Sequence, residues 1–364
     1  MKNTFGHDLT VTLFGESHGP YIGAVLDGLA PGLPVEEDFI RRQLALRRPA
    51  GSISTARREP DEFRIISGVF NGRTCGTPLC ILIPNTQAHS GDYTETRALA
   101  RPGHADYTSY RKYHGFEDYR GGGHFSGRVT AALVAAAAII IPALTAKGIT
   151  IGTHISSCGG VADRGFNDPA QDIAALSARE FAVLDEAKGR AMRDVIAEAA
   201  AAGDSVGGVL ETAVCGLPAG LGEPWFDTVE GLLSHALFSI PAVKGVQFGA
   251  GFDLADSRGS RFNDSFFMDE GQVRTVTNHN GGVNGGLTNG MPVLFRCAVK
   301  PTPSIFTEQR TVDFIRGEDA VLRLQGRHDP AIIHRARVVV DSVTALVVAD
   351  LLCGRFGTDY LGAD

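Results

Sequence analysis

The sequence predicts a mixed α/β or α+β fold in a single domain that covers residues 1–364. Strand-like and helix-like segments alternate along the chain rather than forming separate blocks, which is typical of these two classes. Hydrophobic residues make up 43% of the chain, which is enough to bury a sizeable core. No low-complexity linker and no repeat with a period of roughly 20 to 50 residues divides the sequence. We therefore expect one core, with a strand order that these patterns do not reveal.

The first part of the chain predicts two strands, a helix and several short strands. Residues 9–14 and 21–26 have the apolar patterns of strands. A helix is expected over residues 34–46, because Pro34 suits a helix start and acidic residues follow it in the first turn. Short strands follow within residues 63–83. Residues 89–126 are polar, aromatic and rich in glycine without periodicity, which predicts a long functional loop.

The second part begins with the most apolar helix of the chain, expected over residues 130–147. Its alanine-rich sequence is apolar on nearly every side, which predicts packing on more than one face. It is shorter than the ~20 residues of a membrane span, so we expect a buried helix of a protein with no membrane contact. One or two helices are expected within residues 169–202. The remaining expectations are strands at 209–215 and 293–299, helices at 232–238 and 338–352, and a glycine loop at 281–286.

Charge and cysteine content exclude several classes of protein. The 41 acidic and 34 basic residues give a net charge of −7, whereas nucleic-acid-binding proteins usually carry a basic excess. The six cysteines form no Cys-x-x-Cys pair and no zinc-type spacing, so we expect reduced thiols and no metal site. The amino-terminal residues show no apolar signal stretch. We therefore expect a cytoplasmic protein without a nucleic-acid partner.

The segment Gly15-Glu16-Ser17-His18-Gly19 matches G-x-S-x-G, the nucleophile elbow of serine hydrolases. An elbow needs a strand, a sharp turn and then a helix, but the residues after Gly19 predict a strand. A serine hydrolase acting through Ser17 is therefore a weak alternative. A glycine turn that carries a surface histidine is the other local interpretation.

Three further segments combine groups that could perform acid–base chemistry or bind phosphate. Residues 101–107 place Arg101, His104 and Asp106 within one turn, where a carboxylate could fix the histidine tautomer for proton transfer. Residues 119–128 carry three consecutive glycines before a helix, which suits either a phosphate site or a flexible loop. Residues 326–330 again combine arginine, histidine and aspartate. A salt-bridged surface turn is the alternative for the first and last of these segments.

Arginines are concentrated near the amino terminus of this acidic protein. Six of them fall within eighteen positions: Arg41, Arg42, Arg47, Arg48, Arg57 and Arg58. A small substrate with several negative charges fits this set, because guanidinium groups bind carboxylate and phosphate through two hydrogen bonds. A solvated helix face remains the alternative for Arg41 and Arg42.

Taken together and in this order, the segments resemble the chorismate synthase family. The resemblance covers nearly the whole chain. Its motifs include residues 14–19, 47–49, 57–61, 67–70, 101–107, 118–123, 239–245, 281–290, 300–302 and 326–330.

The resemblance implies a β-α-β sandwich in which helices lie between two antiparallel sheets. It also implies a lyase of the shikimate pathway that converts 5-enolpyruvylshikimate 3-phosphate to chorismate and phosphate by anti-1,4-elimination. The family requires reduced FMN, and NADPH would be needed only if the enzyme reduces its own flavin. A homotetramer is the expected assembly.

The resemblance also implies roles for individual residues. His18 would help to neutralise the departing phosphate, His104 would protonate the reduced flavin, and Asp329 would act on its central-ring nitrogen. The substrate clamp would be Arg47, Arg48, Arg101 and Arg128. The FMN site would comprise His124, Phe125, Ser126, Pro241, Ala242, Gly285, Lys300, Pro301, Thr302, Pro303, Ser304 and Arg327.

The chain departs from the commoner family pattern at three places. His124-Phe125-Ser126 stands where many members have Arg-Ser-Ser, and Pro241 stands where asparagine is usual. Ile53 occupies the approximate position of a further arginine. At these positions the family pattern therefore does not predict which contacts the chain makes to flavin and substrate.

Overall fold

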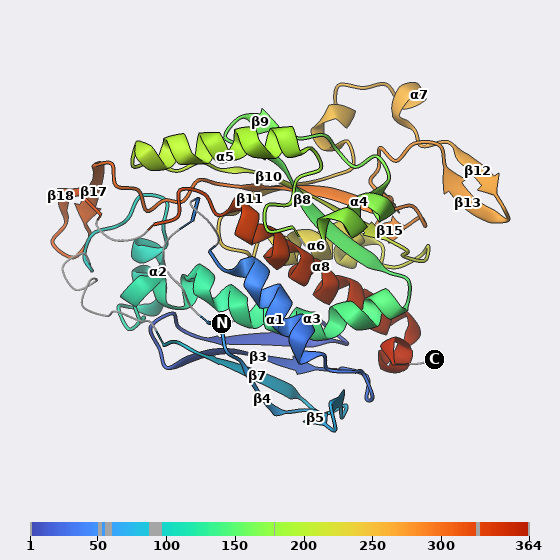
Figure 1. The fold of residues 1–364 in the computed structure, drawn as a ribbon, viewed down its shortest axis with the longest axis horizontal. Coiled ribbons are helices and arrows are strands. Elements are labelled where there is room, and N and C mark those ends of the chain that lie inside the picture. Colours follow the sequence, from blue (N-terminus) through green and yellow to red (C-terminus); the bar gives the residue numbers. More distant parts are fainter. Residues whose placement is uncertain are drawn as a thin grey trace.

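Within the residues that it describes, the computed structural model of the protein has four helices between two antiparallel sheets (Figure 1). The structure describes residues 2–49, 53–54, 60–86, 97–177, 179–324 and 328–362. It confirms the expected β-α-β sandwich. The helices of the central layer are α1 (Glu37–Arg47), α3 (Thr130–Ala146), α6 (Val229–Leu237) and α8 (Ile333–Phe356).

The first sheet has five antiparallel strands in the order β1-β2-β3-β7-β4. Its central strands are largely apolar and present buried side chains to α3, which contacts β2, β3 and β7. The strands are β1 (Thr4–Phe5), β2 (Thr10–Gly15), β3 (Tyr21–Asp27), β4 (Arg64–Ser67) and β7 (Leu79–Pro84).

The second sheet also has five antiparallel strands, in the order β11-β16-β10-β8-β9. One face contacts α8, and the opposite face contacts α4 (Pro169–Leu176) and α5 (Glu186–Ala201). Figure 1 shows α5 on the outside of this sheet. The strands are β8 (Thr150–Cys158), β9 (Val161–Ala162), β10 (Gly208–Cys215), β11 (Val243–Phe248) and β16 (Val293–Val299).

Two of the central helices, α3 and α8, are buried on nearly every side because both of their faces are covered, whereas α1 buries only Ile40, Leu44 and Arg47. In α3, twelve of the seventeen residues are buried, which confirms the packing that the alanine-rich sequence predicts. The segment Gly127–Ala146 is apolar enough to span a membrane by length and composition, but 72% of it is buried inside the protein. It is a core helix, and small alanine side chains let it approach α8 closely.

Two buried carboxylates connect α8 to the sheets on either side of it. Asp350 accepts hydrogen bonds from the backbone N–H groups of residues 7, 8 and 9 at 2.8–3.1 Å. Asp341 accepts a hydrogen bond of 2.6 Å from Thr153 on β8. Burial raises the pKa of Asp341 to about 6, although Arg337 and Thr153 act in the opposite direction. The polar groups of this apolar helix therefore fix its position between the sheets.

Shorter elements decorate the sandwich. Two-stranded hairpins extend from its two ends, and Figure 1 shows β12–β13 projecting well away from the body. The hairpin strands are β5 (Val69–Phe70), β6 (Arg73–Thr74), β12 (Phe266–Asp269), β13 (Gln272–Thr275), β14 (Val283–Asn284), β15 (Leu287–Thr288), β17 (Gln309–Asp313) and β18 (Glu318–Leu322). The remaining helices are α2 (Asp106–Tyr113), α7 (Gly259–Phe262), η2 (Arg120–Phe125), η3 (Gly127–Val129), η4 (Trp225–Asp227), η5 (Gly251–Leu254) and η6 (Thr358–Leu361).

Two of the loop expectations are wrong. Residues 89–126 are not irregular throughout, because α2 and η2 form within them; residues 89–96 lie outside the described part. The helix α2 has little apolar periodicity because only Ser109 among its residues is buried. The glycine loop at 281–286 belongs to the hairpin β14–β15, whose two-residue turn uses Gly285 and Gly286 with positive φ.

All six cysteines are free thiols, as expected. Three are buried and two are partly buried, whereas Cys75 is exposed. Among the residues that the structure describes, no group of three or more His, Cys, Asp or Glu could hold a metal ion.

Candidate active site

The glycine loop before α3 takes a conformation that only glycine adopts easily. Gly121, Gly122 and Gly123 follow one another with φ values of 59°, 86° and 55°. A Cβ atom at Gly121 would overlap the imidazole of His18. A Cβ atom at Gly122 would lie 3.1 Å from Cε1 of His104. The loop therefore passes directly against both predicted catalytic histidines.

His18 lies in the turn that joins β2 to β3. Its ring is 8% exposed, and its Nδ1 lies 3.1 Å from Oγ of Ser17. The backbone N–H of Ser17 donates to the carbonyl of Gly123 at 3.1 Å, and His124 Nδ1 lies 2.8 Å from the carbonyl of Gly15. The glycine loop thus holds the turn, and His18 is buried rather than on the surface.

The nucleophile-elbow interpretation of Ser17 is wrong. The residues after it form β3, which pairs antiparallel with β2, and no helix follows the turn. A serine hydrolase would need that helix at the nucleophile.

His104 is held by an ion pair on its own turn. Arg101 donates to both oxygens of Asp106 at 2.8 and 2.6 Å, and Nδ1 of His104 lies 3.2 Å from Oδ1 of Asp106. Burial alone would raise the pKa of Asp106, but the hydrogen bonds from Arg101 and His104 outweigh it and hold that pKa well below the usual range. Because Nδ1 faces this pair, Nε2 is the nitrogen left to face the loop at Gly122.

A buried carboxylate gathers three of the four predicted clamp arginines. Asp61 forms ion pairs with Arg128, with Arg47 at 3.5 Å and with Arg48 at 3.9 Å, and its side chain is fully buried. Arg47 also donates to the carbonyl of Gly127 at 3.2 Å. Arg47 and Arg128 are buried, whereas the side chain of Arg48 remains 36% exposed. Among the described residues the cluster contains three guanidinium groups and one carboxylate, and it borders the segment that follows the glycine loop.

The fourth clamp arginine, Arg101, lies in the His104 turn. The helix-face alternative holds for Arg41, which is exposed and pairs with Glu37 and Asp38. Arg57 and Arg58 lie outside the described residues.

The predicted FMN segment 300–304 lies beside the His104 turn. Lys300 donates to the carbonyl of Gly103, and a Cβ at Gly103 would lie 3.5 Å from Cβ of Pro303. The backbone N–H of Lys300 donates to the carbonyl of Ala242 at 3.0 Å. The hydroxyl of Thr302 is buried and has no hydrogen-bond partner within the described part of the chain. The Lys300 ammonium group and the glycine loop therefore both lie beside the His104 turn, and the buried Thr302 hydroxyl belongs to the same segment as Lys300.

Pro241 and Ala242 form a tight turn that accounts for the departure at position 241. The N–H of Val243 donates to the carbonyl of Ile240 at 3.2 Å, and Ala242 has a φ of 77°. This is the pattern of a type II turn, in which proline suits the first central position. Ala242 is strained there, and its carbonyl is held by Lys300.

Other predicted flavin residues lie around the same loop. Ser126 caps η3 by accepting a hydrogen bond from the N–H of Arg128 at 3.3 Å. Phe125 is 38% exposed, Pro301 is exposed and Ser304 is buried.

Asp329 reaches this region through Arg335. Arg335 forms an ion pair with Asp329 and donates to the carbonyl of Arg47 at 2.9 Å. The carbonyl of Pro330 accepts a hydrogen bond of 2.8 Å from Val206. The neighbouring hydroxyl of Ser205 donates to the carbonyl of Thr302 at 2.7 Å. Asp329 is thus connected both to the arginine cluster and to the 300–304 segment.

Two of the predicted residues are not brought to this cluster by the described contacts. Gly285 lies in the β14–β15 hairpin, which packs against residues 222–229 near the start of α6. Arg327 lies outside the described residues.

Known proteins give an independent comparison. A family model described as chorismate synthase matches residues 9–353. A chorismate synthase of Thermococcus kodakarensis is 45% identical over 350 residues, which cover 96% of this chain and 97% of the relative. One of Aeropyrum pernix is 46% identical over 352 residues, with 96% and 93% covered.

The chain belongs to the chorismate synthase family. It is therefore a carbon–oxygen lyase that acts on phosphates. A solved crystal structure of a chorismate synthase superposes with a TM-score of 0.77 at 29% identity, covering 97% of this chain and 94% of the other. The chorismate synthase fold therefore extends over nearly the whole chain.

Sequence reasoning missed three residues that organise this chorismate synthase site. Asp61 is the common partner of the arginines, Asn85 contacts both Arg128 and the His18 turn, and Arg335 holds Asp329. The signal for Asp61 was weak: it follows an arginine-rich segment, but Glu59 and Glu62 stand beside it and nothing in the sequence distinguishes the three carboxylates. Asn85 and Arg335 gave no comparable signal, because their partners are mostly backbone carbonyls or residues far along the sequence.

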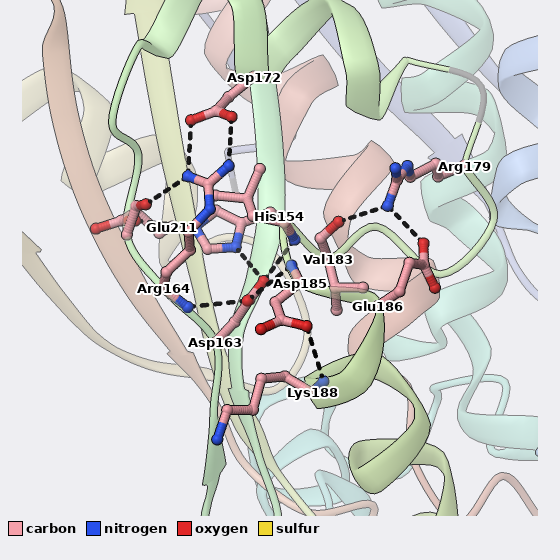
Figure 2. Close-up of polar contacts among 12 residues, drawn as sticks. His154, Asp163, Arg164, Asp172, Arg179, Val183, Asp185, Glu186, Lys188 and Glu211 are labelled. Carbon is pink, nitrogen blue, oxygen red and sulfur yellow. Dashed lines mark hydrogen bonds and ion pairs between the residues drawn. The ribbon is translucent and has the colours of Figure 1, made fainter.

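A second buried acid–base cluster lies on the outer face of the second sheet (Figure 2). His154 is fully buried, with Nε2 at 2.9 Å from Glu211 and Nδ1 at 3.4 Å from Asp163. Asp163 accepts backbone N–H groups from Leu184 and Asp185 at 2.6 and 3.0 Å. The cluster fixes the segment before α5 against β8 and contains none of the predicted site residues.

The electrostatics of this cluster predict pH-dependent stability. Burial alone would raise the pKa of Glu211, but the hydrogen bond from His154 and the charge of Arg296 outweigh it and lower that pKa below the usual 4.5. The contribution of the carboxylate is therefore complete above about 4.5 and is lost as the pH falls through the folded value. We expect Glu211→Gln to lower the free energy of unfolding by about 2–4 kcal/mol at neutral pH, measured by urea denaturation.

The difference between Glu211→Gln and the unchanged protein should shrink as the solution is acidified. Glu186→Gln is the control, because Glu186 forms a largely exposed ion pair with Arg179 and should cost less than about 1 kcal/mol. An unchanged free energy of unfolding at neutral pH, or a loss that does not vary with pH, would contradict the assignment.

Proposed function

We propose that the chain converts 5-enolpyruvylshikimate 3-phosphate to chorismate and phosphate by anti-1,4-elimination, with reduced FMN bound. The reaction would be the last common step of the shikimate pathway to the aromatic amino acids. One observation carries the proposal: His18 and His104, 86 positions apart in the sequence, lie against the consecutive glycines Gly121 and Gly122. Two groups that can transfer protons thus share one loop beside a cluster of arginines.

The charges around this loop suit the substrate, which carries two carboxylates and a phosphate. Within the described part of the chain, Arg47, Arg48 and Arg128 gather at the carboxylate of Asp61, and a concentration of guanidinium groups attracts anions. We expect the most direct contact at Arg48, which is the most exposed of the three. Arg101 would complete the clamp from the His104 turn.

The residues around segment 300–304 fit a flavin mononucleotide. Lys300 offers a cation for the phosphate of FMN. The buried hydroxyl of Thr302 forms no hydrogen bond within the described residues, and a hydrogen bond to FMN would remove the free-energy cost of leaving it unsatisfied. Pro241 does not weaken this fit, because it favours the turn that presents the carbonyl of Ala242 to Lys300. When bound, reduced FMN would supply a basic ring nitrogen and electron density to the elimination.

The roles of the three catalytic residues follow from what holds them. His18, buried in the turn after β2, would stabilise the negative charge of the departing phosphate. As an imidazolium, with Nδ1–H donating to Asp106, His104 would present its Nε2 proton toward the flavin. Asp329, oriented by Arg335, would accept or return a proton at the flavin ring. Exclusion of water would strengthen each of these effects.

We further propose that the protein is a cytoplasmic homotetramer without nucleic-acid or membrane partners. The projecting segment around β12–β13 supports self-association, because it exposes large apolar side chains that its own core does not cover. These residues are Phe252, Phe266, Phe267, Met268, Val273 and Val276, with exposed fractions of 43–82%. A two-stranded hairpin is only marginally stable by itself, so a second copy would also stabilise it.

The reaction can be tested by phosphate release under anaerobic conditions, with dithionite-reduced FMN and 5-enolpyruvylshikimate 3-phosphate. We expect His104→Ala and Asp329→Asn each to lower kcat by about 10²–10⁴-fold, the usual contribution of a positioned acid or base, while FMN still binds. FMN binding is measured separately by fluorescence titration.

The control is His235→Ala, since His235 is an exposed histidine of α6 and should leave kcat unchanged. No phosphate release by the unchanged protein would contradict the proposed function, and near-normal rates in both variants would contradict the assigned roles. NADPH in place of dithionite shows whether the protein reduces its own flavin.

The assembly can be tested by sedimentation velocity. We expect the unchanged protein to sediment as a tetramer, with a mass four times the 38.5 kDa of the chain. Met268→Glu should shift the distribution toward smaller species, because burying a charge at an apolar interface costs free energy. Val321→Glu on β18 is the control, since Val321 is 54% exposed on the other projecting hairpin. A monomer in the unchanged protein, or an identical tetramer in Met268→Glu, would contradict this surface.

A further inference from the structure

Asn85 lies at the end of β7 and uses both ends of its amide. Its Nδ2 donates to the carbonyls of Glu16 and Gly19 at 2.9 and 2.8 Å. Its Oδ1 accepts a hydrogen bond of 3.0 Å from Nε of Arg128. The side chain therefore connects the buried arginine cluster to the turn that carries His18.

The backbone of Asn85 supports the same turn. Its N–H donates to the carbonyl of Pro20 at 3.1 Å, continuing the pairing of Pro84 with Tyr21 between β7 and β3. The turn is thus held from one side by the first sheet and Asn85. From the other side it is held by Gly123, which accepts the N–H of Ser17.

Only an amide of this size satisfies all of these partners. Both carbonyls accept from Nδ2, although that of Glu16 also accepts from the N–H of Gly19, and the Nε of Arg128 requires an acceptor. Aspartate has the same shape and could still accept from Arg128, but its second oxygen would face two carbonyl oxygens. Alanine would leave both carbonyls and the Nε of Arg128 without this partner.

We propose that Asn85 is a positioning residue for His18, transmitting the fixed geometry of the Asp61 and Arg128 ion pair to the turn that presents the imidazole. The inference rests on the proposed function, because it assigns Asn85 to the step that His18 assists. Asn85 itself touches neither reacting group.

The size of the effect follows from how sensitive catalysis is to geometry. A catalytic group displaced by about 1 Å can cost about 10²-fold in rate. Asn85→Asp should therefore lower kcat by about 10- to 100-fold while changing KM less than about threefold, because the substrate-facing arginines remain in place.

A double-mutant cycle separates positioning from a general structural role. Phosphate release is measured for Asn85→Asp, for His18→Ala and for the combined variant, all with reduced FMN. If Asn85 acts through His18, Asn85→Asp should lower kcat by less than about threefold in the His18→Ala protein, because the effects of the two substitutions are then not additive. Asn278→Asp is the matched control, because Asn278 also donates to a carbonyl, that of Pro292 at 2.8 Å, at a distant turn.

Each outcome has a distinct meaning. A normal rate in His18→Ala overturns the role of His18 in the proposed function. If His18→Ala loses activity but Asn85→Asp lowers kcat by the same factor with and without His18, only the Asn85 inference is overturned. A normal rate for Asn85→Asp overturns it as well.

A crystal structure of Asn85→Asp gives an answer that does not depend on activity. The inference expects residues 16–19 to move while residues 121–123 keep their positions. An unmoved turn would overturn it.

Discussion

One buried carboxylate and its arginines set the arrangement on which the candidate site depends. The side chain of Asp61 is fully inaccessible to solvent, and an unpaired charge in such a position would cost several kcal/mol. It must therefore keep Arg47 and Arg128, whose remaining donors then bind backbone carbonyls and Asn85. Asp61 itself has a φ of 50°, a conformation that aspartate tolerates better than most residues. The strained backbone and the ion pairs support each other.

The same anchor organises the chemistry at a distance. From Arg128 the contacts run through Asn85 to the His18 turn, and from Arg47 through Arg335 to Asp329. His104 is held separately, by Arg101 and Asp106, and meets the others at the glycine loop. The sandwich makes this possible because the first sheet, the second sheet and α8 all contribute neighbouring segments. Catalytic side chains that are held by the sandwich and by these ion pairs suit a reaction in which they must stay fixed while charge develops on the substrate.

The sequence was sufficient for the elements that are defined by local pattern. The apolar run of α3 and the alternating strands of the first sheet follow from composition and period alone. The order β11-β16-β10-β8-β9 could not be derived, because its pairings join strands far apart in the chain. The same limit hid the pairing of Asp61 with Arg128, which are 67 positions apart, and the role of Asn85, whose partners include carbonyls that no side-chain pattern reveals. His18 and His104 were identified through motifs, but only the fold explains why both need adjacent glycines.

Hydrogen–deuterium exchange of Asp61→Asn tests most directly whether this carboxylate organises the site. The substitution keeps the shape of the side chain and removes its charge. We expect amide exchange to accelerate about tenfold or more at residues 16–19 and 120–125, because these loops lose their anchored partners, while β10 keeps its protection. Exchange that is unchanged in those loops, or accelerated equally in β10, would contradict the account.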